Sequence, residues 1–302
     1  MSELPNGGWV APNIYYLGYA SVVQFGGLRI AGLSGIYKGN DYDKAHFECP
    51  PFTNYSLVSA YHVRSVEVFR LKQLKKPDFE EASAANKDDV ERNQLGNPAT
   101  MNLLYDLRPN RWFSAHLHVK FTAEFLALDK PLPRRQFLEC LDVPMQDEAA
   151  LELSYDPTWL AILKNTDHLT QLSDKKSYMP GRNAGSSERY DFRPTKQELD
   201  EVATLFNNDF RIPSNFCQTA PPEQKPFAKR RDPPSLYYRN PQSTVFCEKL
   251  GIKDLNFMMC QSIPPGSLGV PYCCEHDGVA SSNNPDEINV GVMMISLVMM
   301  IL

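Results

Sequence analysis

A short hairpin near the N-terminus restricts the fold of this 302-residue chain more than any other feature. Two apolar runs, SVVQF (21–25) and LRIAG (28–32), are separated only by Gly26-Gly27. Both central residues of a primed turn need a positive φ, which glycine adopts without a steric cost. The sequence therefore predicts two neighbouring antiparallel strands, and NIYYLG (13–18) just before them predicts another.

The hydrophobic period changes after about residue 145, where the chain becomes mostly helical. Proline at a first helical position, a capping box and a glycine just past a helix end are the start and stop signals of helices. These signals mark PATMNLLYDL from Pro98, PTWLAILKNT from Pro157, a helix from the Thr195–Glu198 capping box to about Asn208, and FCEKLGI (246–252). Strands followed by helices predict an α+β protein.

Two histidines one residue apart stand in FSAHLHVKF (113–121), in which apolar and polar residues alternate. Because successive side chains of a strand point to opposite faces, both imidazoles share one face. Neutral imidazole suits Zn, Fe or Mn, so His116 and His118 are candidate metal ligands. The alternative is a solvated strand face with two histidines on it by chance, and the spacing alone favours that alternative.

A long loop at 34–52, followed by YHVR at 61–64, carries many aromatic and basic residues. Aromatic rings for stacking and cations for phosphate are what recognition of unpaired RNA requires. An ordinary solvated loop is the alternative, and composition alone favours it. The candidate RNA-binding residues are Tyr37, Lys38, Asp41, Tyr42, Lys44, His46, Tyr61, His62 and Arg64.

Two further basic stretches carry weaker signals. SVEVFRLKQLKK (65–76) begins with strand-like alternation and ends basic, so its cations would add to the RNA-binding surface, and an ordinary basic strand end is the alternative. These cations are Arg70, Lys72, Lys75 and Lys76. Lys229-Arg230-Arg231 lies in a Pro-rich stretch, which we interpret as a linker or a nuclear-import-type patch.

Net charge, cysteine content and the two chain ends limit the partners and the compartment that we expect for this chain. The net charge of −5 does not indicate a polyanion binder for the molecule as a whole, although a local basic face is compatible with it. Seven cysteines without regular spacing, and no signal-like N-terminus, indicate a reducing compartment. The uncharged end VGVMMISLVMMIL (290–302) is shorter than the roughly 20 residues that cross a membrane. We therefore expect a disordered end and no membrane partner.

Long motifs cover most of residues 3–257 and read GGWVAPNIYYLG, LRIAGLSGIYKGNDYDKAHFECPPF, YHVRSVEVFRLKQLK, WFSAHLHVKF, FLALDKPLPRR, YDPTWLAIL, FNNDFRIPSNF and NPQSTVFCEKLGI. Together they resemble the RNA lariat debranching enzyme family. The resemblance implies a remnant of a metallophosphoesterase β-sandwich flanked by helices at 1–144. A mainly helical debranching enzyme C-terminal domain would follow at 145–257, and a disordered tail at 258–302.

The resemblance also implies a hydrolase of mRNA processing and intron turnover, located in the nucleus. The family cleaves the 2′–5′ phosphodiester at the branch point of excised intron lariats, using divalent Fe, Zn or Mn. In this family His116 and His118 would each contact one metal of a binuclear centre, and Ser34–Phe52 would be the lariat recognition loop. Branched RNA is the implied partner, and splicing-associated proteins are candidate further partners.

The chain also departs from the family's pattern. The family's Gly-Asn-His and Ser-His-Asp motifs occur nowhere in the 302 residues, and family segments are missing after Phe79 and after Glu124. Ala45 stands where relatives have Gly, and Pro131 where they have Cys. We expect a form truncated at its N-terminus and gapped inside, with sheet edges left uncovered.

These departures bear on activity. Two imidazoles on one strand cannot hold two metals, so we expect no complete catalytic site, no complete binuclear centre and little or no turnover. The alternative function is that of a non-catalytic RNA- or partner-binding fragment.

Overall fold

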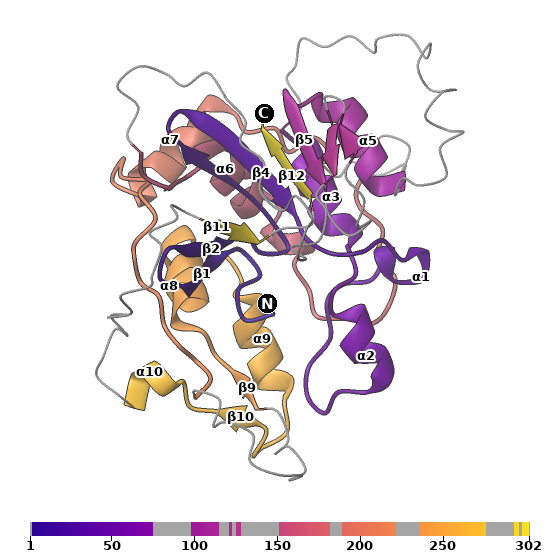
Figure 1. Cartoon of the computed structure of the whole chain (residues 1–302), viewed down its shortest axis with the longest axis vertical. Helices are drawn as coiled ribbons and strands as arrows, with labels where there is room; N and C mark the ends of the chain where they lie inside the picture. Colours follow the sequence, from indigo (N-terminus) through magenta and orange to yellow (C-terminus); the bar gives the residue numbers. More distant parts are fainter. Residues whose placement is uncertain are drawn as a thin grey trace.

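The computed structural model describes residues 2–74, 98–114, 121–122, 125–127, 151–181, 189–221, 236–275, 293–295 and 298–301. Helices and strands mix along the chain, so the predicted α+β class is confirmed (Figure 1). The strands are β1 (Gly8–Ala11), β2 (Ile14–Tyr16), β3 (Ala20–Phe25), β4 (Leu28–Leu33), β5 (Arg111–Ser114), β6 (Phe121–Thr122), β7 (Phe125–Ala127), β8 (Ser154–Tyr155), β9 (Tyr237–Tyr238), β10 (Leu268–Gly269), β11 (Met293–Ile295) and β12 (Val298–Ile301). The helices are α1 (Gly39–Tyr42), α2 (Asn54–Ser59), α3 (Ser65–Lys72), α5 (Pro98–Leu107), α6 (Pro157–Asn165), α7 (Lys196–Leu205), α8 (Pro241–Leu250), α9 (Leu255–Ser262) and α10 (Tyr272–Glu275).

The predicted hairpin is present as β3 and β4. These strands pair antiparallel from Ala20↔Leu33 to Phe25↔Leu28. Gly26 and Gly27 have φ values of 57° and 77°, which is the conformation that a primed turn requires. The local sequence was sufficient here because both turn residues and both flanking runs agree.

A seven-stranded sheet in the order β6-β7-β5-β12-β4-β3-β8 forms the centre of the fold. In Figure 1 the C-terminal strand β12 lies between β4 and β5, and it runs antiparallel to both. A second sheet, β1-β2-β11, and the parallel pair β9–β10 complete the strands among the described residues.

The C-terminal region differs from the disordered tail that we expected at 258–302. Its described residues form the end of α9, and β10, α10, β11 and β12. Met300 is fully buried in the main core, and the backbone of β12 pairs on both sides. The prediction of disorder was based on the composition of residues 290–302 alone. In the structure the edges of β4 and β5 supply hydrogen-bond partners for the backbone of β12.

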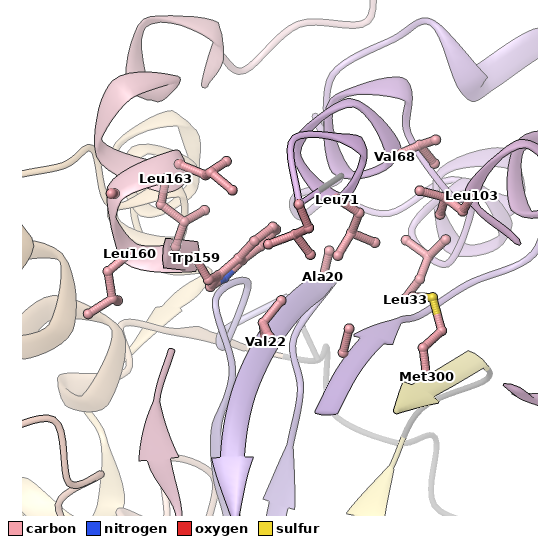
Figure 2. Packing of buried hydrophobic residues seen from close by; sticks show 14 of the residues in the cluster. Ala20, Val22, Leu33, Val68, Leu71, Leu103, Trp159, Leu160, Leu163 and Met300 are labelled. Carbon is pink, nitrogen blue, oxygen red and sulfur yellow. The ribbon is translucent and has the colours of Figure 1, made fainter. Parts of the chain in front are cut away.

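The largest core joins segments from both of the predicted domains. Figure 2 shows Val22 and Leu33 of the hairpin, Leu71 of α3 and Trp159 of α6 converging on one cluster, with Met300 beside Leu33. All five side chains are almost completely buried. The cluster contains side chains from both sides of residue 144, the first being Ala20 and the last Met300.

The predicted helix signals are confirmed with shifted bounds. The Thr195–Glu198 capping box begins α7, which ends at Leu205 rather than near Asn208. Helix α8 begins at Pro241, earlier than predicted, and ends at Leu250, with the predicted Gly251 just past its end at φ 72°. Both α5 and α6 begin at the predicted prolines.

Residues 65–72 are the helix α3, so the interpretation of 65–76 as a strand was wrong. The carboxylate of Glu67 accepts a hydrogen bond from the Arg64 backbone N–H at 2.5 Å, which satisfies a free donor at the helix start. Val68 and Leu71 are buried three residues apart on one face. The helical spacing of Val68 and Leu71 therefore predicts the secondary structure of this segment better than the polar–apolar alternation of residues 65–68 does.

Several predicted features lie outside the described residues, among them His116, His118 and Lys229-Arg230-Arg231. The strand FSAHLHVKF is described at its two ends only, in β5 and β6. No helix in the described ranges combines the length and hydropathy that crossing a bilayer would take. Cys217 and Cys273 form a disulfide that the cysteine spacing did not indicate.

Asp156 joins the sheet to α6 and gives a test of the fold. Its carboxylate caps Trp159 N at 2.9 Å and pairs with Arg29 through Nε and Nη2, both at 2.7 Å. We expect Asp156→Ala to lower the free energy of unfolding by about 2–4 kcal/mol, because a cap and charge-assisted hydrogen bonds are lost together. Asp191→Ala, which removes a solvent-exposed pair with Arg193, is the control and should change urea unfolding little. Equal effects of the two substitutions would contradict this assignment.

Candidate RNA-recognition site

The loop between β4 and α3 is fixed at its base by the backbone. Ile36 N donates to Tyr61 O at 2.9 Å, and Val63 N donates to Ile36 O at 3.1 Å. Gly35 has φ 115°, and a Cβ there would lie 2.7 Å from Tyr61 O. Only glycine therefore allows the two ends of the loop to approach this closely.

A fully buried arginine, Arg64, organises the interior of the loop. Its Nη1 donates to Asp41 O at 2.7 Å, at the end of α1. Its Nη2 donates to Glu48 Oε1 at 2.5 Å and to Ser59 O at 3.0 Å. The planar guanidinium thus ties α1, the middle of the loop and the end of α2 to the start of α3.

A second buried contact extends this arrangement to the sheet. The Nε2 atom of His46 lies 2.7 Å from Glu67 Oε1, while the other Glu67 oxygen accepts the Arg64 N–H. The His46 ring also stacks on Tyr19, with centroids 3.9 Å apart and planes at 12°. His46 therefore connects the loop both to α3 and to the residue before β3.

The Asp41 carboxylate accepts hydrogen bonds from three other side chains of the loop region. Its carboxylate accepts from Lys44 Nζ and from His62 Nδ1, each at 2.8 Å, and from the Tyr55 hydroxyl. Burial by itself would raise the pKa of Asp41, but these hydrogen bonds outweigh it and hold the pKa well below its usual range. The carboxylate is therefore ionised at neutral pH.

Opposing effects also set the protonation of the deeper groups. Burial would raise the pKa of Glu48, but the nearby His46 ring, the hydrogen bond from Ser59 and the charge of Arg64 lower it to about 2. Burial would lower the pKa of His46, and the negative charges of Glu67 and Glu48 reverse this, so its pKa is raised. Both carboxylates that face His46 thus favour the imidazolium.

The structure divides the predicted RNA-binding residues into two groups. Asp41, His46, His62 and Arg64 are buried and hold the loop in shape. Lys38 and Tyr61 are exposed, and Tyr37, Tyr42 and Lys44 are partly exposed. Only the second group presents side-chain surface to a ligand.

The exposed surface includes residues that sequence reasoning missed. Tyr55 is 49% exposed and Phe52 is 36% exposed, both in or beside α2. Lys44 Nζ lies 5.2 Å from the centroid of the Tyr55 ring and 5.9 Å from that of Phe47, so one cation lies near two rings. The signal available in the sequence was the aromatic run around PFTNY.

The buried carboxylates were missed as well. Glu48 stands in the apolar run HFECPP and Glu67 in VEVF, positions at which a charged side chain indicates a buried partner. Their partners lie 16 and 21 residues away, at Arg64 and His46. No local spacing rule connects residues so far apart.

The loop also contacts the segment after α6. Ser177 N donates to Asp43 O at 2.6 Å, and isolated bridges pair Lys44 with Lys176 and His46 with Leu172. The loop is therefore positioned by the C-terminal half of the chain as well as by the sheet.

The residues that the structure describes do not assemble a metal site. Within the described ranges no group of three or more His, Cys, Asp or Glu side chains is arranged to hold an ion. The metal-ligand prediction for His116 and His118 falls outside those ranges and stays a prediction.

Replacing Arg64 tests the role of the buried network. We expect Arg64→Ala to lower the free energy of unfolding by about 3–5 kcal/mol, because Glu48 would be left buried without its cation. Lys38→Ala, in the same loop and exposed, is the matched control and should leave urea unfolding unchanged. A cost below about 1 kcal/mol for Arg64→Ala would show that the network does not stabilise the loop.

His46 gives the loop a stability that depends on pH. Its folded pKa is raised, so its contribution is complete below the unfolded pKa of about 6.5 and is lost as pH rises through the folded value. The difference in unfolding free energy between wild type and His46→Gln should therefore shrink from pH 6 upward. A His46→Gln difference that grows with pH would refute the assigned charge state.

Comparison with known proteins places the chain among relatives of one kind. The family of the lariat debranching enzyme C-terminal domain matches residues 120–255. The lariat debranching enzymes of Caenorhabditis briggsae, Caenorhabditis elegans and Homo sapiens are each 42% identical to this chain. The alignments cover 96%, 96% and 95% of its residues, respectively. The chain spans 66%, 67% and 59% of the lengths of these relatives.

The alignments also bear on the internal gaps. The match to the Caenorhabditis briggsae enzyme runs over 341 positions, which is more than the 302 residues of the chain. The relative therefore has internal segments that this chain lacks, in agreement with the predicted gaps. By identity and by coverage, the chain belongs to the lariat debranching enzyme family.

Proposed function

We propose that this chain binds branched RNA through the exposed side chains of residues 34–64. The observation that carries the proposal is a set of aromatic and cationic groups, Lys38, Lys44, Tyr55 and Tyr61, on a loop whose interior is fixed by buried hydrogen bonds. Unpaired bases stack on such rings, and cations neutralise phosphates. A rigid loop loses little conformational entropy on binding, which favours affinity.

The family supports a specific reaction. The relatives are named lariat debranching enzymes, which makes the family one of hydrolases acting on phosphodiesters and implies a divalent metal. For this chain we propose the 2′–5′ phosphodiester of an intron lariat as the bond recognised, the nucleus as its location, and splicing-associated proteins as further partners. The sheet would be the remnant of a metallophosphoesterase sandwich, and the helices after residue 145 the C-terminal domain.

We further propose that these 302 residues bind without efficient cleavage. Only His116 and His118 match the family's ligand motifs, whereas the Gly-Asn-His and Ser-His-Asp motifs are missing from the sequence. A two-metal hydrolase needs ligands for both ions and a water held between them. The chain would then act as a binding fragment, which is the second candidate function.

The test compares a branched oligonucleotide with its linear counterpart at low salt. We expect branched RNA to bind more tightly than linear RNA. The logarithm of the affinity should fall linearly with the logarithm of the salt concentration, with a slope of about 0.7 per neutralised phosphate. Tyr61→Ala and Lys38→Ala should each weaken binding about tenfold, because stacking or phosphate contact is lost. Tyr105→Ala and Lys196→Ala, which truncate the same residue types on α5 and α7, are the matched controls. Equal losses in all four variants would contradict the proposed surface.

Cleavage is measured in the same samples after addition of Mn²⁺, Fe²⁺ or Zn²⁺. We expect product to form no faster than with the His116→Ala/His118→Ala double variant. Metal-dependent cleavage that the double variant abolishes would show that the chain is a complete enzyme. Binding and cleavage are read separately, so either part of the proposal can fail alone.

A further inference from the structure

A small cavity of about 50 Å³ lies between the start of β3, helices α3 and α6, and the residues that follow α6 and α8. A volume of this size holds about three to five water molecules or one small ion, and it is too small for a nucleotide. Its wall has an apolar part, which includes Trp159 and Leu163, and a polar part, which includes Arg70, Thr170 and Lys253. Because Lys253 is exposed, the cavity is accessible from solvent.

Two cations of this wall bind the same short 3₁₀ turn, which follows α6. Arg70 Nε donates to Thr166 Oγ1 at 2.9 Å, and Arg70 Nη2 donates to Thr166 O at 3.2 Å and to Thr170 Oγ1 at 2.7 Å. Lys253 Nζ donates to Thr170 O at 3.0 Å and to Asp167 O at 3.3 Å. Both cations therefore contact Thr170, which brings two positive charges close together.

The side chains of both cations have uncharged hydrogen-bond partners, namely hydroxyl and carbonyl oxygens. Among the described residues, no carboxylate forms an ion pair with Arg70 or with the Lys253 ammonium. Glu67 stands in the same wall, but it accepts from His46 Nε2 at 2.7 Å. The Asp167 carboxylate accepts from the backbone N–H of Lys253 at 2.8 Å. The wall of the cavity thus carries more positive than negative charge.

Both cations also keep N–H groups for a ligand. Neither N–H of Arg70 Nη1 has an acceptor among the described residues, and one N–H of the Lys253 ammonium is left over. Burial lowers the pKa of Arg70 to about 10 although the charges of Glu67 and Asp167 oppose this shift, so the guanidinium lacks counter-charge. A guanidinium matches the oxygen atoms of phosphate, and an ammonium adds a point charge.

We propose that this cavity is a binding site for a small oxyanion of the phosphate class, held by Arg70 and Lys253. The anion is inorganic phosphate or a phosphate group of a bound RNA, because both present the same oxygen atoms. The apolar part of the wall strengthens the attraction, since charges interact more strongly where water is excluded. The described residues that line the cavity include none of the exposed side chains of the proposed RNA surface, so this site does not depend on that proposal.

The test titrates inorganic phosphate into the full-length chain by calorimetry, with sodium chloride of equal ionic strength as the reference. We expect saturable binding of one phosphate per chain. Arg70→Gln and Lys253→Gln should each weaken it about tenfold or more, because each removes a charge-assisted hydrogen bond. Lys196→Gln, which removes an exposed lysine of α7, is the matched control and should leave the affinity unchanged. Heats that do not differ from those of chloride, or equal affinities in all three variants, would overturn the proposal.

Two further measurements keep the result decisive. If circular dichroism shows that Arg70→Gln is unfolded, Lys253→Gln decides alone, because its side chain is exposed, and an unchanged phosphate affinity would then overturn the site. Branched-RNA affinity with and without saturating phosphate identifies the source of the anion. Competition assigns it to an RNA phosphate and independence assigns it to free phosphate, and both results require an occupied site. Tyr61→Ala should leave phosphate affinity unchanged, which separates this site from the proposed RNA surface.

Discussion

The candidate site depends on the burial of one charge, the guanidinium of Arg64. A buried cation needs a balancing charge and hydrogen-bond acceptors, since the cost of removing it from water exceeds a single Coulomb contact. Glu48 supplies the balancing charge, and the carbonyl oxygens of Asp41 and Ser59 accept from Nη1 and Nη2, while Nε has no hydrogen-bond partner among the described residues. The partners come from different parts of one loop, so satisfying the arginine fixes the path of the whole loop.

This arrangement separates two tasks within a single segment. The buried polar side chains give the loop its shape, and the exposed side chains of Lys38 and Tyr61 are left free of that role. Lys44 and Tyr55 take part in both, because each binds the Asp41 carboxylate while part of its own side chain is exposed. A change on the outer surface can therefore alter ligand binding with little effect on folding, whereas a change at Arg64 alters both.

The central sheet shows how a gapped member of the family can still bury its core. We expected missing segments to leave strand edges uncovered, and the longer alignments with relatives agree that segments are missing. The facing edges of β4 and β5 are nevertheless paired, because β12 lies between them. One hydrophobic cluster contains side chains of the N-terminal strands and of the later helices, from Ala20 to Met300. These two parts of the chain therefore stabilise one another.

The sequence by itself determined the β3–β4 hairpin, the starts of α5, α6 and α7, and the family, because these depend on short motifs and local backbone preferences. It also located the loop that carries the candidate site. Only the tertiary structure decided that Arg64 and His46 are buried while Lys38 and Tyr61 face outward. It alone placed the apolar C-terminus inside the sheet. The physical reason is that burial and strand pairing are set by partners 16 or more residues away, and a local pattern carries no information about such partners.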